Sequence, residues 1–587
     1  MNAFIDYLNS MHSIKGDGLG ALAERQIQSP YSPACHVPRH LGQIIADRIR
    51  AGENVAYIIT GHAGDGKTSI LVQVLRELGM IQSGEVLASE KICQNNNGKL
   101  YYVKDMSEVR LELRVAYLRK ALEAPSTGMS SILISNTGPL LSTFEDLLMA
   151  DCVQKGEAYD EARRRTNQTE LLDQLDTNQG GTRTIGDYAF SMINIARIDN
   201  VSFASAFLHN ILSAELWSPC AACEKKGNCP IWQNYQTVRD NEGRVAQFIN
   251  AFLRYTYEFD QRLTIRQIQA QLCYALTGGM NCRDVIPHHN YPQFKYGFPN
   301  LFFGYRGSEI DNEAAKIKAI RMLQGMELDS AALPIDYDLF VKDRIDFFPD
   351  SIRDTIAREV LPKLKLLNRS ADADIQKRNK KAIALRKGLR RYYLVYGHLP
   401  QEDMLDCVFG KGFTLYEDIA SHSGQPRAKL NRIRDYFFNA LYLTNTGFLP
   451  HSGSDNQIPL TLHRKDGVFQ SVMLVLGRVS KNELSIRQNP KQGHFEDDQS
   501  RQQVLLEARG RTFSISLPMF LYFVTQSSGA VASACNPALT HNIARLETLL
   551  MDAFQNPSGT EIELLTNTTQ GQRYQRLYIE DDKLQLD

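Results

Sequence analysis

Residues 61–68 read GHAGDGKT, which fits the phosphate-binding pattern G-x-x-x-x-G-K-[ST]. A run of β-forming residues, Val55 to Thr60, precedes this stretch, and a helical pattern from Lys67 to Gly79 follows it. Strand, glycine-rich loop and helix therefore occur in the order that the motif requires. The glycines allow successive backbone N–H groups to face a phosphate, beside the positive end of the helix dipole. The stretch predicts a P-loop nucleotide site.

The motif also assigns roles to single residues. Lys67 can reach the β- and γ-phosphates of ATP, and the Thr68 hydroxyl can ligate Mg²⁺. A plain glycine turn between a strand and a helix would not explain the adjacent lysine and threonine. The residues expected to bind ATP and Mg²⁺ are Gly61, His62, Ala63, Gly64, Asp65, Gly66, Lys67, Thr68 and Ser69.

Two more apolar strands are expected at Leu100–Val103 and Ser131–Ser135. In a parallel sheet their C-terminal ends lie at the edge where the ligand binds. Asp105 follows the first strand and can hold Mg²⁺ through water, although an aspartate there can equally cap a helix. The next residue is Met106, where a catalytic glutamate often stands. Glu108 is therefore the nearest candidate for the catalytic carboxylate.

Asn136 and Arg266 are the remaining candidates for catalysis. Asn136 ends the second strand and resembles the polar residue that orients the attacking water in AAA+ ATPases, the alternative being a turn asparagine. The helical pattern from Leu263 to Gly278 resembles the lid of an AAA+ module, with Thr264 as its cap. Arg266 lies in the first turn, where an arginine is unfavourable against the helix dipole unless it serves the γ-phosphate. Its alternative role is a surface ion pair.

These elements predict an α/β P-loop NTPase core of AAA+ type with a helical lid. A further strand at Ser191–Ala196 would complete the sheet. Beyond Gly304 the pattern changes to long helices, and from about Ile458 to short alternating runs, which predicts a helical region and a C-terminal α+β domain. The expected domains are an N-terminal segment 1–50, the ATPase core 51–215, a cysteine-containing insertion with the lid 216–300, a helical domain with basic helices 301–455 and the C-terminal domain 456–587.

Basic residues gather in three places. Arg163 to Arg165 can supply an arginine finger to a neighbouring subunit or form a solvated helix face. The second place, Asp374 to Tyr393, and the third, Arg427 to Arg434, can contact DNA phosphates or an acidic partner, or remain solvated faces. The basic residues of the second place are Lys377, Arg378, Lys380, Lys381, Arg386, Lys387, Arg390 and Arg391.

Length and composition indicate an ordinary soluble protein. The 587 residues are enough for about three or four domains. Hydrophobic residues make up 43% and charged residues 22%, and 66 basic side chains balance 66 acidic ones. No global field therefore draws the chain to nucleic acid or to a membrane. The start lacks a signal-peptide pattern and no segment approaches the ~20 apolar residues of a membrane span, so a cytoplasmic location is expected.

Three of the ten cysteines cluster as Cys220-x-x-Cys223-x5-Cys229. Thiolates at this spacing can share a tetrahedral Zn²⁺, and a fourth ligand would come from Cys273, Cys282 or His209. Three free cysteines in a loop are the alternative, and an iron–sulfur cluster is a third option. A metal here would brace the insertion rather than take part in chemistry.

The chain resembles the DptF family, also called DndF. The resemblance is carried by the loop GHAGDGKTS, the strands LYYVKDMSEV and ILISNTGPL, the run NIARIDN, the cysteine cluster and the lid TIRQIQAQLCYALTGG. That family is the ATP-binding component of the DptFGH system, which restricts DNA that lacks phosphorothioate marks. The resemblance implies ATP hydrolysis in an assembly with DptG and DptH, with DNA bound directly or through those partners, and leaves a homo-oligomer open.

The expected function is therefore that of a Mg²⁺-dependent P-loop ATPase in a DNA restriction complex. In this interpretation Lys67, Asp105, Glu108, Asn136 and Arg266 form the catalytic set. The alternative belongs to another class: a scaffold or switch that changes its oligomeric state on binding ATP and hydrolyses little, consistent with the missing Asp-Glu pair.

Overall fold

The computed structural model divides into two compact units. Unit 1 comprises Met1–Pro400 and Gln492–Asp498, and unit 2 comprises Gln401–Lys491 and Gln499–Asp587. The structure describes residues 1–587 except 13–28, 83–84, 178–180, 288–290, 370–374, 399–400, 452–454, 463–470, 491–494, 531–535, 556–560, 569–570, 581–582 and 587. Within the described ranges, no helix combines the length and the apolar character needed to cross a membrane.

Unit 1 contains a six-stranded, mostly parallel sheet in the order β2-β3-β4-β1-β6-β5. The four central strands are parallel, as the sequence predicts, because β1 pairs in parallel with β4 and β6, and β3 with β4. The two edge strands are antiparallel and were not expected. The strands are β1 (Ala56–Thr60), β2 (Glu90–Asn95), β3 (Gly98–Val103), β4 (Ser130–Ile134), β5 (Arg183–Ile185) and β6 (Tyr188–Asn194).

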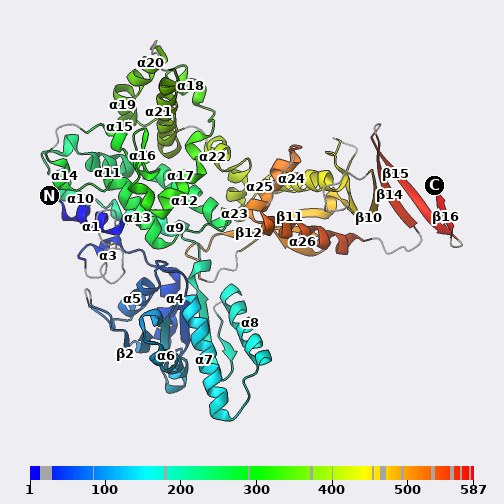
Figure 1. Cartoon of the computed structure of the whole chain (residues 1–587), viewed down its shortest axis with the longest axis horizontal. Helices are drawn as coiled ribbons and strands as arrows, with labels where there is room; N and C mark the ends of the chain where they lie inside the picture. The colour runs from blue at the N-terminus through cyan, green and yellow to red at the C-terminus, as the bar shows by residue number, and fades with distance from the viewer. Residues whose placement is uncertain are drawn as a thin grey trace. The chain divides into compact units, whose positions relative to one another are not determined.

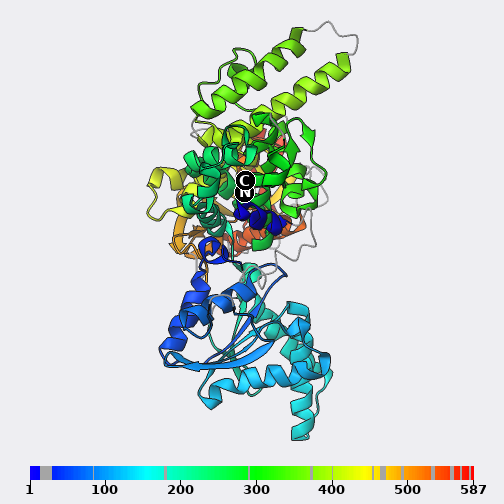
Figure 2. The ribbon, with the colours of Figure 1, turned by 90° about the vertical axis from the view of Figure 1, so that its left-hand side faces the viewer.

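Alternating side chains of each strand point to opposite faces of the sheet. Helices cover both of these faces (Figure 1, Figure 2). Tyr57 and Ile59 of β1 pack into one core with α4 (His40–Arg50) and α5 (Lys67–Glu77). Ala56 and Ile58 pack into the other core. That second core includes side chains of α6 (Leu111–Glu123), α7 (Thr137–Lys155) and α8 (Glu161–Thr177). The unit thus has the three-layer α/β arrangement that buries a parallel sheet on both sides.

A short 3-10 helix lies between β3 and helix α6, which begins only at Leu111. The Asp105 side chain accepts a hydrogen bond from the Ser107 amide at 2.8 Å and caps a short 3-10 helix, Met106–Glu108. Val109 is then extended, which separates that turn from α6. Asp105 therefore does act as a cap, and it still lies directly after β3.

The middle of the chain is helical. Helix α13 (Ile265–Thr277), the expected lid, packs against α1 (Ala3–His12) and α9 (Val201–Ile211). The remaining helices of this region are α3 (Ser32–Cys35), α10 (Ala214–Ala221), α11 (Pro230–Asp240), α12 (Glu242–Glu258), α14 (Cys282–Val285), α15 (Gln293–Tyr296), α16 (Phe298–Phe302), α17 (Lys318–Met326), α18 (Asp336–Phe340), α19 (Asp350–Glu359), α20 (Leu361–Arg369) and α21 (Ile375–Tyr396). The short strands β7 (Tyr305–Arg306) and β8 (Glu309–Ile310) form a hairpin.

Only the first part of helix α21 carries exposed basic side chains. Arg391 is fully buried against the ring of Tyr305, with the carboxylate of Asp329 at 3.5 Å. Arg390 forms a bidentate ion pair with Asp336, with N–O distances of 2.6 and 3.0 Å. These two arginines hold the unit together and are unavailable to DNA. The exposed basic residues lie in the first turns, at Lys377, Lys380 and Lys381, whereas Asp374 is outside the described residues.

The two other basic clusters are also partly neutralised. On α8, Arg163, Arg164 and Arg165 are exposed and contact acidic residues, as in the solvated helix face that is one of their two expected roles. On α24 (Arg427–Thr446), Lys429 contacts Asp418. Exposed ion pairs of this kind contribute little stability.

Unit 2 combines helices with two antiparallel sheets. One sheet has the order β16-β15-β14-β10-β9 and the other β11-β12-β13. Both agree with the expected C-terminal α+β character. Its elements are α22 (Gln401–Phe409), α23 (Phe413–Ser421), α24, α25 (Leu517–Ser527), α26 (Pro537–Phe554), β9 (Gln457–Leu462), β10 (Val472–Ser480), β11 (Leu484–Pro490), β12 (Gln502–Ala508), β13 (Arg511–Ser514), β14 (Glu561–Thr568), β15 (Gly571–Glu580) and β16 (Lys583–Leu586).

A short segment between β11 and β12 belongs to unit 1. Phe495 is only 2% exposed and lies in the core beside α4 and α5. The Glu496 carboxylate accepts a hydrogen bond from the Asp199 amide at 3.1 Å, and Asp497 pairs with Arg39 at 2.6 Å. A piece of sequence from the C-terminal third therefore completes the core of the N-terminal sheet.

We predict that Phe495→Ala destabilises unit 1 by about 3–5 kcal/mol, because it removes a buried aromatic side chain and leaves a cavity. Both tryptophans of the chain, Trp217 and Trp232, belong to unit 1, so tryptophan fluorescence during urea unfolding follows this unit alone. Tyr337→Ala is the control, since Tyr337 is 62% exposed. Equal unfolding midpoints for the two variants would show that the segment does not support this core.

Candidate nucleotide-binding site

The loop from Gly61 to Gly66 joins β1 to α5, as the sequence predicts. Gly66, which precedes α5, has φ +87°, and Gly64 has φ +89°. A Cβ at Gly66 would lie 3.0 Å from the side chain of Ile265, and one at Gly64 would lie 3.1 Å from that of Arg266. Both glycines are required by the backbone conformation and by the close approach of the lid helix α13.

Lys67 points back into this loop. Its ammonium group donates hydrogen bonds of 2.9 Å to the carbonyl oxygens of Gly61 and His62 and to the side-chain oxygen of Asn136. Burial lowers the pKa of Lys67, whereas the nearby carboxylates of Asp65 and Asp105 raise it. The loop thus surrounds one buried positive charge, placed where β1 ends.

Asn136 connects that charge to the neighbouring strand end. Its amide nitrogen donates a hydrogen bond to the Ser107 hydroxyl at 3.0 Å, and the Ser107 amide is bound by Asp105. The C-terminal ends of β1, β4 and β3 therefore meet around Lys67, in the order set by the sheet. Asn136 and Asp105 come together with the loop as expected from their positions after parallel strands.

The other loop residues differ in their exposure. His62 and Ala63 are exposed, whereas Thr68 and Ser69 are partly buried in the first turn of α5. The free N–H groups of that turn and the helix dipole favour an anion at this end. Thr68 follows Lys67 directly in this turn.

Glu108 is placed poorly for catalysis. Its side chain is 66% exposed and lies 3.7 Å from the ammonium group of Lys104. Met106, which occupies the position directly after Asp105, is completely buried. Neither residue brings a carboxylate to Lys67, so the structure does not unite Glu108 with the other candidates.

Arg266 lies at the start of the lid, where α13 touches the loop. Thr264 and Gln267 form a reciprocal capping box, and the Arg266 amide donates a hydrogen bond to the Gly64 carbonyl at 3.1 Å. Burial lowers the pKa of the Arg266 guanidinium. Within the described part of the chain this guanidinium has no hydrogen bond or ion pair, so the alternative role in a surface ion pair is not seen there.

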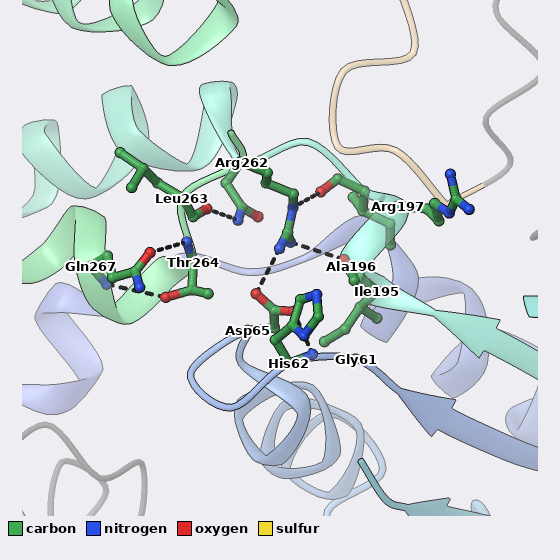
Figure 3. A network of polar contacts seen from close by, with 12 residues as sticks. Gly61, His62, Asp65, Ile195, Ala196, Arg197, Arg262, Leu263, Thr264 and Gln267 are labelled. Carbon is green, nitrogen blue, oxygen red and sulfur yellow. Dashed lines mark hydrogen bonds and ion pairs between the residues drawn. The ribbon is translucent and has the colours of Figure 1, made fainter. Parts of the chain in front are cut away.

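Arg262 is a residue that the sequence reasoning missed (Figure 3). Its guanidinium binds the Asp65 carboxylate at 2.7 Å and donates to the carbonyl oxygens of Ile198 and Ile195 at 2.7 and 2.9 Å. The other oxygen of Asp65 accepts from the His62 amide at 2.9 Å. Arg262 therefore ties the loop, the end of β6 and the lid together. Nothing in one sequence signals a contact between residues so far apart.

A small cavity lies beside the loop. It opens between the first turns of α5 and α13 and the segment that contains α3. The side chains and backbone around it come from Tyr7, Ser32, Cys35, His36, Val37, Arg39, Gly66, Ser69, Gln73, Phe203, Ile265 and Gln269.

The cysteine cluster lies apart from the loop, around α10 and α11. Of the three candidates for a fourth ligand, Cys273 is buried beside Met11 and His209 binds Glu242. Cys282 is the one that lies near the cluster, since Asn2 donates hydrogen bonds to the sulfur atoms of both Cys282 and Cys220. Among the described residues, no three His, Cys, Asp or Glu side chains converge closely enough to hold a single metal ion.

Comparisons with known proteins found no matching protein-family model, no matching curated protein and no matching solved structure. The function is therefore inferred from the geometry of this chain.

We predict that Arg262→Met destabilises unit 1 by about 3–5 kcal/mol, because it leaves the Asp65 carboxylate buried without its cation. Adding Asp65→Asn should restore part of that loss, since the uncompensated charge is then gone. Arg197→Met is the control: its ion pair with Asp176 is more than half exposed and should be worth about 1 kcal/mol or less. Urea unfolding followed by tryptophan fluorescence measures these variants and the single variant Asp65→Asn. Strictly additive effects at positions 65 and 262 would contradict the coupling.

Proposed function

We propose that this chain binds ATP and Mg²⁺ at residues 61–69 and hydrolyses the γ-phosphate bond. The observation that carries the proposal is the buried ammonium group of Lys67, held by the loop and by Asn136 at the ends of adjacent parallel strands. A ligand in an open parallel sheet binds outside these strand ends. A phosphate there would replace the carbonyl oxygens as the partner of Lys67.

Each nearby residue then has a role in an AAA+-type ATPase. Thr68 and Asp105 hold Mg²⁺, Asn136 orients the attacking water, and Arg266 contacts the γ-phosphate. The sheet order supports this assignment, because β4 with Asn136 lies between β1 with the loop and β3 with Asp105. The cavity beside Gly66 is suited to the base, since its lining comes from both the loop and the lid.

We further propose that this ATPase works in a DNA restriction complex of the DptFGH kind. The basis is the resemblance in sequence, and DptG and DptH are the implied partners. DNA bound by this chain itself would meet the exposed first turns of α21, at Lys377, Lys380 and Lys381, rather than the buried arginines near its end. Lysines on an exposed helix face contact phosphates without reading sequence.

One observation favours the second candidate, an ATP-dependent switch or scaffold with little hydrolysis. Met106 fills the position after Asp105, and Glu108 is exposed to solvent and beside Lys104. Without a carboxylate that activates water, hydrolysis would be slow. The binding energy of ATP could still close the lid on the loop through Arg266. Steady-state ATP turnover separates the two candidates.

We predict that Lys67→Ala weakens MgATP binding roughly thirty-fold or more, because a partly desolvated charge contact with phosphate is worth about 2–5 kcal/mol. Isothermal titration calorimetry measures the affinity. Lys91→Ala is the matched control, since Lys91 is exposed and pairs with Glu85.

The same variant tests the biological proposal. In a cell that contains the partner genes, Lys67→Ala should fail to restrict DNA without phosphorothioate. Restriction that persists although ATP turnover is abolished would favour the scaffold. Unchanged affinity in the variant would reject the nucleotide site itself.

We predict that Arg266→Ala lowers the affinity for ATP about tenfold or more and leaves that for ADP nearly unchanged, since one charge-assisted hydrogen bond to the γ-phosphate is lost. The control is Arg197→Ala, which removes an exposed arginine near the lid. Binding of both nucleotides is measured by calorimetry. An equal loss for ATP and ADP would place Arg266 away from the γ-phosphate.

A further inference from the structure

Four cysteines of unit 1 gather at the end of α10. Backbone hydrogen bonds from residue i+3 to residue i run in succession from Cys223 to Cys220, from Lys226 to Cys223 and from Cys229 to Lys226. In such tight turns, residues three apart lie above one another. Cys220, Cys223 and Cys229 therefore face the same side of this segment.

Cys282 reaches the same place from the distant end of the lid. The backbone amide of Asn2 donates to the Cys282 sulfur at 3.4 Å, and its side-chain amide donates to the Cys220 sulfur at 3.4 Å. Asn2 is itself buried, and it is further fixed by a 3.0 Å hydrogen bond to the Leu216 carbonyl. One residue thus bridges the two sulfurs. Hydrogen bonds from N–H groups to sulfur are a common feature around metal thiolates.

Four thiolates gathered at one place would repel one another. A metal centre bound to all four compensates their negative charge as their protons are released.

We propose that Cys220, Cys223, Cys229 and Cys282 bind one [4Fe–4S] cluster. No disulfide consumes any of the four, and no three metal-binding side chains of the described residues converge on a point suited to one ion. A single zinc ion needs its thiolates at about 2.3 Å from one centre. In a cubane cluster each cysteine binds a different iron, so the sulfurs stand farther apart around a larger body.

The surroundings suit a cluster with a structural role. Cys223, Cys229 and Cys282 are partly exposed, so the centre lies near the surface and is open to oxygen and chelators. Cys282 follows the lid helix α13 closely, and Asn2 leads directly into α1, which packs along α13. The cluster would join these two helices to α10 and α11. This inference is independent of the proposed ATPase activity.

The test is the metal content of the full-length chain, purified without oxygen and then reconstituted with ferrous iron and sulfide. We expect about four iron atoms and four acid-labile sulfides per chain, with a broad visible absorption band. Cys220→Ser, Cys229→Ser and Cys282→Ser should each lose most of the iron. Cys407→Ser is the control and should retain it, since Cys407 is an exposed cysteine of unit 2.

The wild-type protein decides the question even where a variant fails to fold. Iron and sulfide in the stated ratio, absent from the Cys282→Ser variant but present in Cys407→Ser, support the cluster. About one zinc per chain without sulfide would overturn it in favour of a single-ion site. A wild-type chain with neither metal after reconstitution, or iron retained by Cys282→Ser, would overturn the four-cysteine centre.

Discussion

The ion pair between Arg262 and Asp65 is the contact on which the arrangement of the site depends. Asp65 belongs to the loop and its side chain is fully buried, so its charge must be met by a cation. Arg262 provides that cation from the segment that leads into the lid, and its other N–H groups satisfy carbonyl oxygens after β6. The conformation of the loop and the placement of the lid are consequently set by the same guanidinium.

The segment that follows β11 packs close to the residues that Arg262 binds. Asp199, next to one of the carbonyl oxygens bound by Arg262, forms a buried ion pair with Arg254, and its amide donates to Glu496. Phe495 fills the core under α4 and α5. Arg262 and this segment thus contact neighbouring residues: Arg262 binds Ile198, and Glu496 binds Asp199.

Burial changes the meaning of the charged residues. A helical pattern with many lysines and arginines predicts a basic surface, yet Arg391 lies against an aromatic ring and Arg390 pairs with Asp336. Arginine is suited to such positions because its planar group stacks and forms two parallel hydrogen bonds. Lys67 is likewise a basic residue that does not face solvent, because it lies inside a loop whose polar backbone compensates its charge. Which basic residues face solvent is decided by the partners that the fold brings to them.

The sequence by itself determined the loop and the two strands that precede Asp105 and Asn136. It also determined the helix that Thr264 caps and the α+β character of the C-terminal part of the chain. These depend on local periodicity, glycine spacing and capping, which act over a few residues. The antiparallel edge strands, the Arg262–Asp65 pair, the place of Phe495 in the first core and the meeting of Cys282 with the other three cysteines were decided only by the tertiary structure. Each joins residues far apart along the chain, and their contact depends on packing that no local pattern encodes.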